Sequence, residues 1–316
     1  MALDHYVSQV HLKNFYSPLL NKQMYAIRKS DLYRFTTKAS SVCRIEDGST
    51  NSYLTEDRVI EDFLKIIEPK YNVSIEKIKT DRIDEESIFV VAGFVGYVLS
   101  CSPAGMRIQS SPLRNIVELV GKRLDARGTL PPPPSVLNAP DFTTLLDRGE
   151  VRVEIDPKYP QAIGIQSILN TVSCLGNFTW EILINRIEDS PFFTSDFPVA
   201  FEATSHPQII NKVIPLSPIL AIRIHPNTSY DIKNNDFSFS RFRCLFREIS
   251  RKEILEINRL IVRCAESLVF FQKDLPWVQR FVQKNSAYRV EAINENINTK
   301  SGNYIITRIG VAPFHE

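Results

Sequence analysis

Three polar residues near the start of the chain, His5, Gln9 and Lys13, lie four residues apart. The sequence predicts a helix from His5 to about Phe15 with Asp4 as its N-cap, and this spacing would place the three side chains on one face. In the first turn the helix dipole disfavours an imidazolium ion, so His5 would stay the neutral base that proton abstraction requires. His5 is therefore a candidate general base. The alternative is that its side chain caps the helix and bonds a core carbonyl.

A second group of candidates lies in the turn Ser195-Asp196-Phe197-Pro198, which we expect at the end of a strand. A carboxylate in this position can orient a histidine or hold a ligand hydroxyl. Asp196 could equally form an Asx turn that bonds its own backbone. Ser195 could cap this turn or bind a ligand, but its flanks lack the G-x-S-x-G pattern of a nucleophilic serine.

Arg107 and Ser217 are further polar candidates. Arg107 follows a Ser-Pro-Ala-Gly turn. A guanidinium near a loop suits recognition of phosphate or carboxylate, and the alternative is a surface salt bridge. Ser217 lies between Leu216 and Pro218, which is more typical of a turn residue that bonds the backbone than of a reacting group.

The densest basic run of the chain is interleaved with aromatic residues. Such a mixture could hold an RNA strand by phosphate contacts and stacking. A solvated face beside a core stripe is the alternative that we prefer. The run contains Arg241, Phe242, Arg243, Phe246, Arg247, Arg251 and Lys252.

Common cofactor and metal motifs are absent from the sequence. There is no G-x-x-x-x-G-K-[ST] loop, no G-x-G-x-x-G and no H-E-x-x-H. The five histidines lack metal-ligand spacing, and the five cysteines are far apart without a C-x-x-C pair. We therefore predict neither a metal site nor a cofactor. Isolated cysteines are also typical of a reducing cytosol.

The 316-residue chain has an ordinary composition, with 43% hydrophobic residues, 23% charged residues and a formal net charge of +2. This balance excludes wholesale disorder and argues against bulk DNA binding. The first residues lack the basic-then-apolar order of a signal peptide. The apolar run from Ile88 to Cys101 is shorter than the roughly 18 to 20 residues that cross a bilayer. We therefore expect a cytoplasmic protein without a membrane partner.

The first half of the chain is predicted to be mainly helical, with a possible β-hairpin over 24–35. Thr55 is expected to cap one helix, and 85–101 should form a buried helix in which two glycines allow close packing. Ser111-Pro112 has the cap-then-proline order of another helix start. Pro131–Pro134 would form a stiff extended connector, near which the chain could divide.

In the second half a helix over about 159–175 precedes segments whose apolar residues alternate, as in strands. Ser250-x-x-Glu253 is a capping box that would open a long helix reaching about Phe271. The predicted fold class is therefore α+β. A helical N-terminal half would pack on a mostly antiparallel sheet from the C-terminal half, with a long C-terminal helix, in a single domain of residues 1–316. The expected strands lie near 178–184, 209–214, 219–224 and 304–309.

Three segments together resemble a bacterial family. They are His5-Tyr6-Val7-Ser8-Gln9 continuing to Leu12-Lys13-Asn14-Phe15, then Phe193-Thr194-Ser195-Asp196-Phe197-Pro198-Val199, and then Ile214-Pro215-Leu216-Ser217-Pro218. In order and spacing they resemble the family catalogued as domain of unknown function 4238, whose members typically carry HYVPQFYLRNF, SDNPV and PLSP. The resemblance spans nearly the whole chain and implies one interwoven domain. It implies candidate positions but no reaction.

The chain departs from the family pattern at three positions. Ser8 stands where the family usually has proline, and Phe197 where it often has asparagine. Cys101 stands where the family commonly has an arginine before a Ser/Thr-Pro pair. If that arginine binds an anionic substrate, Arg107 is the residue that could substitute for it.

From the residues and the resemblance together we predict a metal-independent phosphoester hydrolase or nuclease that acts on RNA or a nucleotide. His5 would be the general base, held by Asp196, while Gln9 and Arg107 would bind the anionic group. The alternatives are a non-catalytic ligand-binding or regulatory module and a purely structural role. The enzyme prediction requires that His5 folds back against Asp196 to line one cavity. Residues expected to bind substrate are Tyr6, Lys13, Asn14, Ser195 and Ser217.

Overall fold

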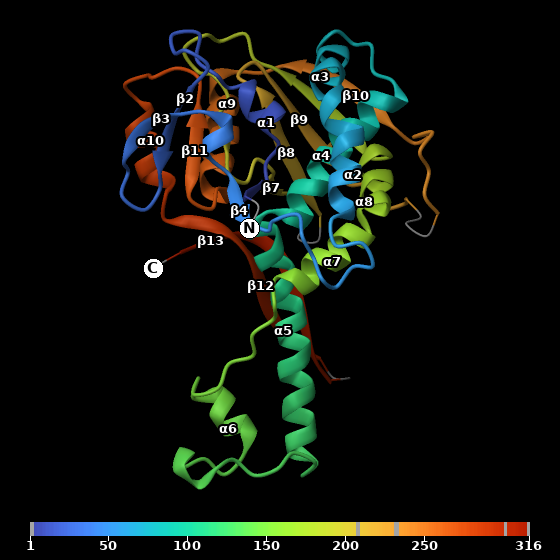
Figure 1. The fold of residues 1–316 in the computed structure, drawn as a ribbon, viewed down its shortest axis with the longest axis vertical. Coiled ribbons are helices and arrows are strands. Elements are labelled where there is room, and N and C mark those ends of the chain that lie inside the picture. The colour runs from blue at the N-terminus through green and yellow to red at the C-terminus, as the bar shows by residue number, and fades with distance from the viewer. Residues whose placement is uncertain (1–2, 207–208, 231–233, 300–301, 315–316) are drawn as a thin grey trace.

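A five-stranded sheet lies in the head of the molecule, and a helical arm projects from the head (Figure 1). The computed structural model describes residues 3–206, 209–230, 234–299 and 302–314. In spatial order the sheet consists of β10 (Arg243–Glu248), β5 (Thr179–Ile184), β9 (Leu220–His225), β8 (Ile210–Ser217) and β7 (Ala200–Ala203). Neighbouring strands are antiparallel, except that β10 runs parallel to β5. The α+β class and the mostly antiparallel pairing are thus confirmed.

A four-stranded sheet joins segments from both halves of the chain. Its spatial order is β3 (Arg34–Thr37), β2 (Met24–Arg28), β11 (Leu268–Phe271) and β6 (Thr194–Ser195). The predicted hairpin is present as β2 and β3, and β11 lies between β2 and β6. The other two pairs are β1 (Leu3–His5) with β4 (Arg44–Glu46), and β12 (Tyr288–Thr299) with β13 (Gly302–Pro313).

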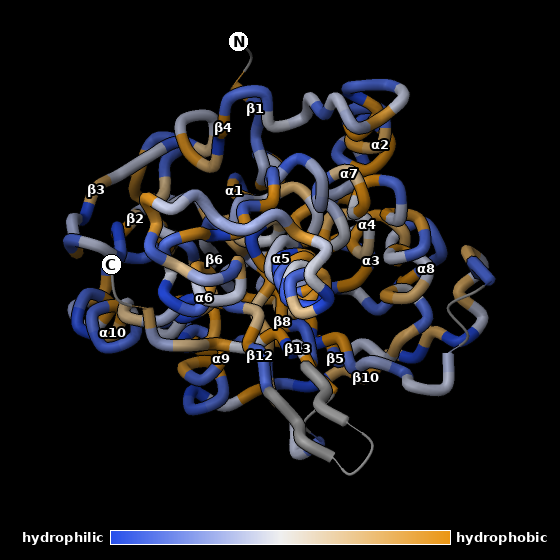
Figure 2. Tube along the Cα trace, turned by 90° about the horizontal axis from the view of Figure 1, so that it is seen from below, coloured by the Kyte–Doolittle hydropathy of each residue, from blue (hydrophilic) through white to orange (hydrophobic). Residues whose placement is uncertain are grey.

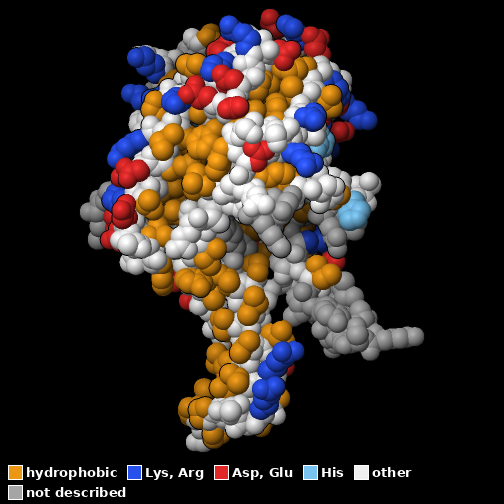
Figure 3. Space-filling model, turned by 90° about the vertical axis from the view of Figure 1, so that its right-hand side faces the viewer, with side chains coloured by type: hydrophobic (Ala, Val, Ile, Leu, Met, Phe, Trp, Pro, Cys, Tyr) orange, Lys and Arg blue, Asp and Glu red, His pale blue; other side chains and the backbone are white. Residues whose placement is uncertain are grey.

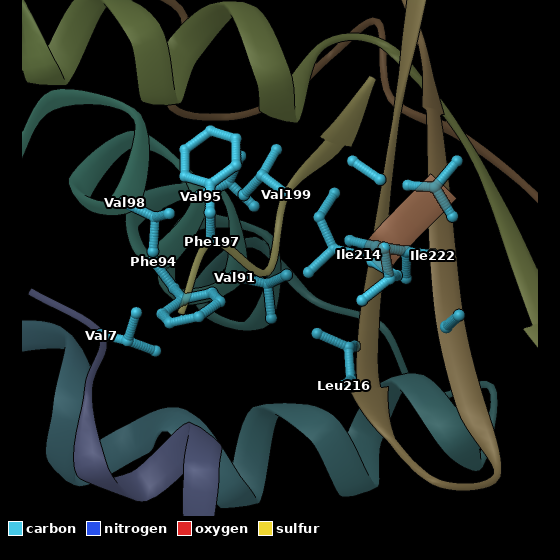
Figure 4. Packing of buried hydrophobic residues seen from close by; sticks show 14 of the residues in the cluster. Val7, Val91, Phe94, Val95, Val98, Phe197, Val199, Ile214, Leu216 and Ile222 are labelled. Atoms are coloured by element: carbon cyan, nitrogen blue, oxygen red, sulfur yellow. The ribbon is translucent and has the colours of Figure 1, made fainter. Parts of the chain in front are cut away.

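The helix predicted over 85–101 is present as α4 (Glu85–Cys101) and is almost wholly buried. Asp84 caps it by accepting a hydrogen bond from the Ser87 backbone N–H at 2.9 Å. α4 packs against α3 (Tyr71–Lys79), α7 (Lys158–Gln166) and α8 (Ile168–Gly176). Hydrophobic stretches of the chain lie mainly toward the middle of the head (Figure 2). Figure 4 shows part of this core, where α4 meets β8 and the 197–199 segment through Val91, Phe94, Val95, Val98, Phe197, Val199, Ile214 and Leu216.

The longest helix, α5 (Pro103–Ala126), leaves the head and forms the arm together with α6 (Phe142–Asp147) (Figure 1). Hydrophobic side chains run along the arm (Figure 3), and Ile116 is 58% exposed. Within the described residues no single helix has the length and apolar character to cross a membrane, whereas α4 and α5 meet these limits together but bend by 62° at their junction. The remaining helices are α1 (Gln9–Lys13), α2 (Val59–Ile67), α9 (Arg251–Cys264) and α10 (Val278–Asn285).

The helix predicted from His5 begins four residues later than expected. Residues 3–5 form β1, where His5 pairs with Arg44, and α1 begins only at Gln9. Asp4 does not cap a helix, because its carboxylate accepts hydrogen bonds from Arg58 and from the Ser49 backbone N–H. His5 and Gln9 therefore do not share a helix face.

The prediction of a long C-terminal helix is wrong. The capping box is present at Ser250 and Glu253, but α9 ends at Cys264. The next residues turn so that backbone N–H groups of 266–268 bond the Asp196 carboxylate, and the chain then enters β11. The last helix, α10, has 8 residues.

Three smaller predictions of helix limits are also wrong. α2 follows Arg58 rather than Thr55. Ser102 caps α5 by accepting from the Gly105 N–H at 3.1 Å, so Pro112 lies inside that helix instead of opening a new one. The helix predicted over 159–175 is broken at Ser167 into α7 and α8.

Candidate functional site

Asp196 is buried, with 2% of its surface exposed, and its carboxylate binds backbone rather than a catalytic partner. It accepts hydrogen bonds from the N–H groups of Glu266, Ser267 and Leu268 at 2.9, 2.8 and 2.9 Å. Burial raises the pKa of Asp196 to about 6, with the N–H donors acting in the opposite direction. Asp196 thus fixes the turn between α9 and β11.

Ser195 is likewise buried and bonds the backbone. Its hydroxyl accepts a hydrogen bond from the Phe197 N–H at 3.1 Å. The polar side chains of this turn therefore satisfy main-chain donors, which a buried turn requires. Neither Ser195 nor Asp196 lines the cavities that hold the other candidate residues.

His5 lines a small open cavity of about 210 Å³ together with Gln9 and three carboxylates, those of Asp4, Glu61 and Glu68. Burial lowers the pKa of His5, while the backbone carbonyl of Ala39 raises it. The Nε2 atom is buried and has no hydrogen-bond partner among the described residues. No hydrogen bond or ion pair within the described chain joins His5 to Asp196, so the predicted histidine–aspartate pair is not formed.

The side chain that lies close enough to Asp196 to be affected by its charge is that of Tyr6, and not that of His5. Its backbone N–H donates to the Cys43 carbonyl at 2.9 Å. Burial is the largest cause that raises the pKa of Tyr6, and the negative charge of Asp196 adds to it. Successive side chains of an extended segment point to opposite sides, which explains why His5 and Tyr6 separate.

Arg107 reaches the Asp196 turn through an ion pair. Its guanidinium binds Glu266 and donates to the Val290 carbonyl at 2.9 Å, with Glu291 3.6 Å away. The side chain is 26% exposed. Arg107 therefore links α5 to the 264–268 segment and to β12, which matches the salt-bridge alternative more closely than a free anion receptor.

Asn14 and Ser217 come together in a groove of about 290 Å³ that also includes Gln272. The Asn14 amide donates to the Leu216 carbonyl at 3.4 Å. The Ser217 hydroxyl accepts from the Ile219 N–H at 3.4 Å, as expected of a turn residue. The groove is separate from the His5 cavity, because the two share no lining residue.

A wide depression, about 720 Å³ in volume, collects cations from three segments. We call it the lysine basin. No Asp or Glu lines it, and its three lysines are exposed and form no salt bridge with a described carboxylate. Its lining residues are Gln9, Lys13, Tyr16, Asn21, Lys22, Lys38 and Ser40.

The fold brings the basin together in a way that sequence spacing partly reveals. Gln9 and Lys13 both come from α1, and their four-residue spacing indicated a shared face. Lys22 and Lys38 flank the β2–β3 hairpin and were missed, because no local pattern connects them to α1.

A hydrogen bond holds two of the basin segments together. The Tyr16 hydroxyl accepts from the Ala39 N–H at 3.0 Å and ties the segment after Lys38 to the end of α1. Three ammonium groups around one depression can bind phosphate or carboxylate.

Two of the five basic residues in the run after residue 240 form ion pairs. Arg247 binds Glu181 at 2.7 Å and also pairs with Glu253. Arg251 lies 3.5 Å from Asp189. These pairs and the exposure of all five basic residues agree with the preferred alternative of a solvated face beside a core stripe.

His11, which sequence reasoning did not single out, is a fully buried histidine. Its Nδ1 lies 2.8 Å from the Tyr71 hydroxyl, and its Nε2 lies 2.9 Å from the Thr194 hydroxyl. The ring stacks on Phe94. Burial lowers the pKa of His11 to about 3, so the imidazole is neutral. The only signal in the sequence was its place within the first segment of the family resemblance, next to Leu12.

Comparison with known proteins supplies a family for this chain. No curated protein and no solved structure matches it. The model of the family described as "Protein of unknown function (DUF4238)" matches residues 4–274, a range that holds Asp196 and every residue of the lysine basin. This range covers most of the chain, so the protein belongs to the DUF4238 family.

Proposed function

We propose that the protein is a non-catalytic binding module for a phosphate-bearing ligand, either a nucleotide or a segment of RNA, and that the lysine basin is its binding site. The observation that carries the proposal is the convergence of Lys13, Lys22 and Lys38 on one depression without a carboxylate in its lining. Ammonium groups gathered without counter-charges repel one another, and a bound phosphate relieves this repulsion. The net charge of the chain is only +2, so the concentration of positive charge is local.

The rest of the basin suits the same ligands. Its volume of about 720 Å³ is in the range of small-ligand sites. Gln9, Asn21 and Ser40 add amide and hydroxyl groups that can bond phosphate or sugar oxygens. Tyr16 adds an aromatic ring, a common partner for a nucleobase.

Binding is better supported than the predicted phosphoester hydrolysis. Gln9 lines both the basin and the neighbouring cavity of His5, so a bound phosphate would lie beside the candidate base. The His5 cavity, however, is lined by three carboxylates, and one cation, Arg58, pairs with two of them, Asp4 and Glu61. The excess negative charge disfavours a phosphate. The second catalytic group, Asp196, is engaged by three backbone donors elsewhere. Hydrolysis therefore stays a prediction, and His5 and Asp196 do not form the catalytic pair that it requires.

Fluorescence anisotropy of the purified protein tests the proposal, with labelled ATP in one arm and a labelled single-stranded RNA in the other. Lys22→Ala should weaken binding of the true ligand about tenfold, because one charged contact to phosphate is lost. Lys65→Ala removes the same charge from an exposed lysine that pairs with Asp62 on α2, and it should leave the affinity unchanged. Equal weakening by both variants, or no binding of either ligand by the wild type, would contradict the proposal.

A further inference from the structure

A second cavity, about 410 Å³ in volume, opens where the end of β2, the 265–268 segment and the start of β12 meet. It shares no lining residue with the lysine basin, so its chemistry does not depend on phosphate binding there. Serine hydroxyls and two aromatic rings surround two basic residues, Lys29 and Arg28, and one carboxylate, that of Glu266. Its principal lining residues are Lys29, Ser267, Glu266, Ser286, Tyr288 and Phe314.

Lys29 is held in place from both ends. Its backbone N–H donates to the Ser267 carbonyl at 2.8 Å, which extends the pairing of β2 with β11. Its Nζ atom donates to the carbonyls of Ala265 and Tyr288, each at 2.6 Å. The residue is only 8% exposed, so the amine sits at the inner wall of the cavity.

The two carbonyls leave one position on the Lys29 nitrogen without a bond to the protein. They accept two of its N–H bonds, so the third N–H of the ammonium, or the lone pair of the neutral amine, has no partner among the described residues. Because Lys29 lines the cavity, this remaining position is available to a molecule bound there.

Burial favours the neutral form of the amine. It is the largest cause of the shift and lowers the pKa of Lys29 to about 8, against the attraction of Asp196 and Glu266. Both carboxylates are already compensated, Asp196 by three N–H donors and Glu266 by Arg107. Burial raises the pKa of the nearby Cys264 thiol to about 11, so it is uncharged near neutral pH. The other charged neighbours are held in ion pairs: Arg28, Arg289 and Glu291.

We infer that Lys29 is a reactive amine that condenses with a small hydroxylated aldehyde or ketone bound in this cavity. The nitrogen lone pair forms a bond to the carbonyl carbon, and one amine hydrogen moves to the carbonyl oxygen. The second amine hydrogen then leaves with that oxygen as water, which gives the imine. Ser267 and Ser286 can bond hydroxyls of the ligand.

Reductive trapping of the folded protein tests this inference without a mutation. Glycolaldehyde and cyanoborohydride are added at pH 7, and the rate of adduct formation at each lysine is followed by peptide mass spectrometry. An amine with a pKa of about 8 is neutral about 300 times more often at pH 7 than one at the ordinary 10.5. Lys29 should therefore react at least about tenfold faster than exposed Lys13, Lys22 and Lys65.

Three further measurements make the test specific. The rate at Lys29 should level off above pH 8, whereas the rates at exposed lysines keep rising. The preference for Lys29 should disappear in urea. Acetaldehyde, which lacks the hydroxyl that the cavity serines would bond, should show a smaller preference for Lys29 than glycolaldehyde does. Modification of Lys29 no faster than that of exposed lysines, persistence of its preference in urea, or an equal or stronger preference with acetaldehyde would overturn the inference.

Discussion

Two buried titratable side chains, Asp196 and His11, connect segments that lie far apart in the chain. Asp196 binds backbone about 70 residues downstream, and His11 binds Thr194 on β6. The family resemblance drew attention to the two segments that contain His11 and Asp196. The structural roles of these residues depend on distant partners, which no local sequence pattern identifies. The four-residue spacing correctly placed Gln9 and Lys13 on one depression. It failed for His5 because residues 3–5 form a strand and the helix begins only at Gln9.

Acid should destabilise the protein through His11. The folded pKa of about 3 lies below the ordinary 6.5, so the stabilisation is complete above pH 6.5 and is lost as the pH falls toward 3. The free energy of unfolding should fall by up to about 1.4 kcal/mol per pH unit in this range. Urea unfolding at several pH values should show this slope for the wild type, and a shallower one for His11→Gln. Parallel curves for the two proteins would contradict the assignment.

The role of His5 can be separated from that of the basin lysines. His5→Ala should leave the affinity for nucleotide or RNA within about twofold of the wild type, because no basin contact is removed. Anisotropy measures the affinity, and product analysis after long incubation measures turnover. If wild-type protein cleaves the ligand and His5→Ala does not, the hydrolase prediction is correct and the non-catalytic proposal is wrong.

Among the elements, α4 shows most clearly how close packing limits substitution. A Cβ atom on Gly93 would lie 3.0 Å from the ring of Phe63 and 3.2 Å from Ile67 on α2. A Cβ atom on Gly96 would meet its nearest neighbours, Ile168 and Thr171 of α8, at an ordinary 3.5 Å. Close helix packing therefore requires glycine at position 93, whereas position 96 has room for a methyl group.

Alanine substitutions at these two positions form a matched pair. Gly96→Ala should stabilise the protein by roughly 0.5–1 kcal/mol, because alanine loses less conformational freedom in a helix. Gly93→Ala should instead destabilise it by about 1–3 kcal/mol, because the added methyl group overpacks the contact with Phe63. Urea denaturation gives both values, and equal effects would show that α4 and α2 are not packed as described.

Elements with a strong local signal were predictable. The apolar length of α4, the alternation in β5 and the capping box of α9 all lie within short windows of sequence. The end of α9 could not be predicted from the local sequence. The chain leaves the helix there because the N–H groups of residues 266–268 bond the carboxylate of Asp196, which is distant in the sequence. The lysine basin was predictable only in its α1 part, since Lys22 and Lys38 arrive through tertiary structure.

For the whole molecule, the head carries one continuous cluster of buried apolar residues from Val7 to Val290, and the arm projects beyond it (Figure 1). The arm has its own small contact, in which Phe142 of α6 lies over Gly121 of α5. The predicted stiff Pro131–Pro134 segment lies in the arm, between α5 and α6. The arm should therefore loosen without unfolding the head.

Gly121→Ala tests this independence. The new methyl group would lie 2.8 Å from the Phe142 ring and should displace α6 from α5. Limited proteolysis should cut the 127–141 segment faster, while the melting temperature of the protein falls by less than about 2 °C. A large drop in melting temperature, parallel to faster cleavage, would show that the arm and the head unfold as one unit.

The salt dependence of ligand binding tests the proposed function most directly, since only phosphate contacts release counterions in proportion to their number. The measurement compares wild-type protein with a variant in which Lys13, Lys22 and Lys38 are all replaced by glutamine. For single-stranded RNA, the slope of log K against log salt should be shallower in the variant by about 2, or roughly 0.7 for each lost contact. An unchanged slope, with the RNA still bound, would mean that the phosphates lie elsewhere on the protein.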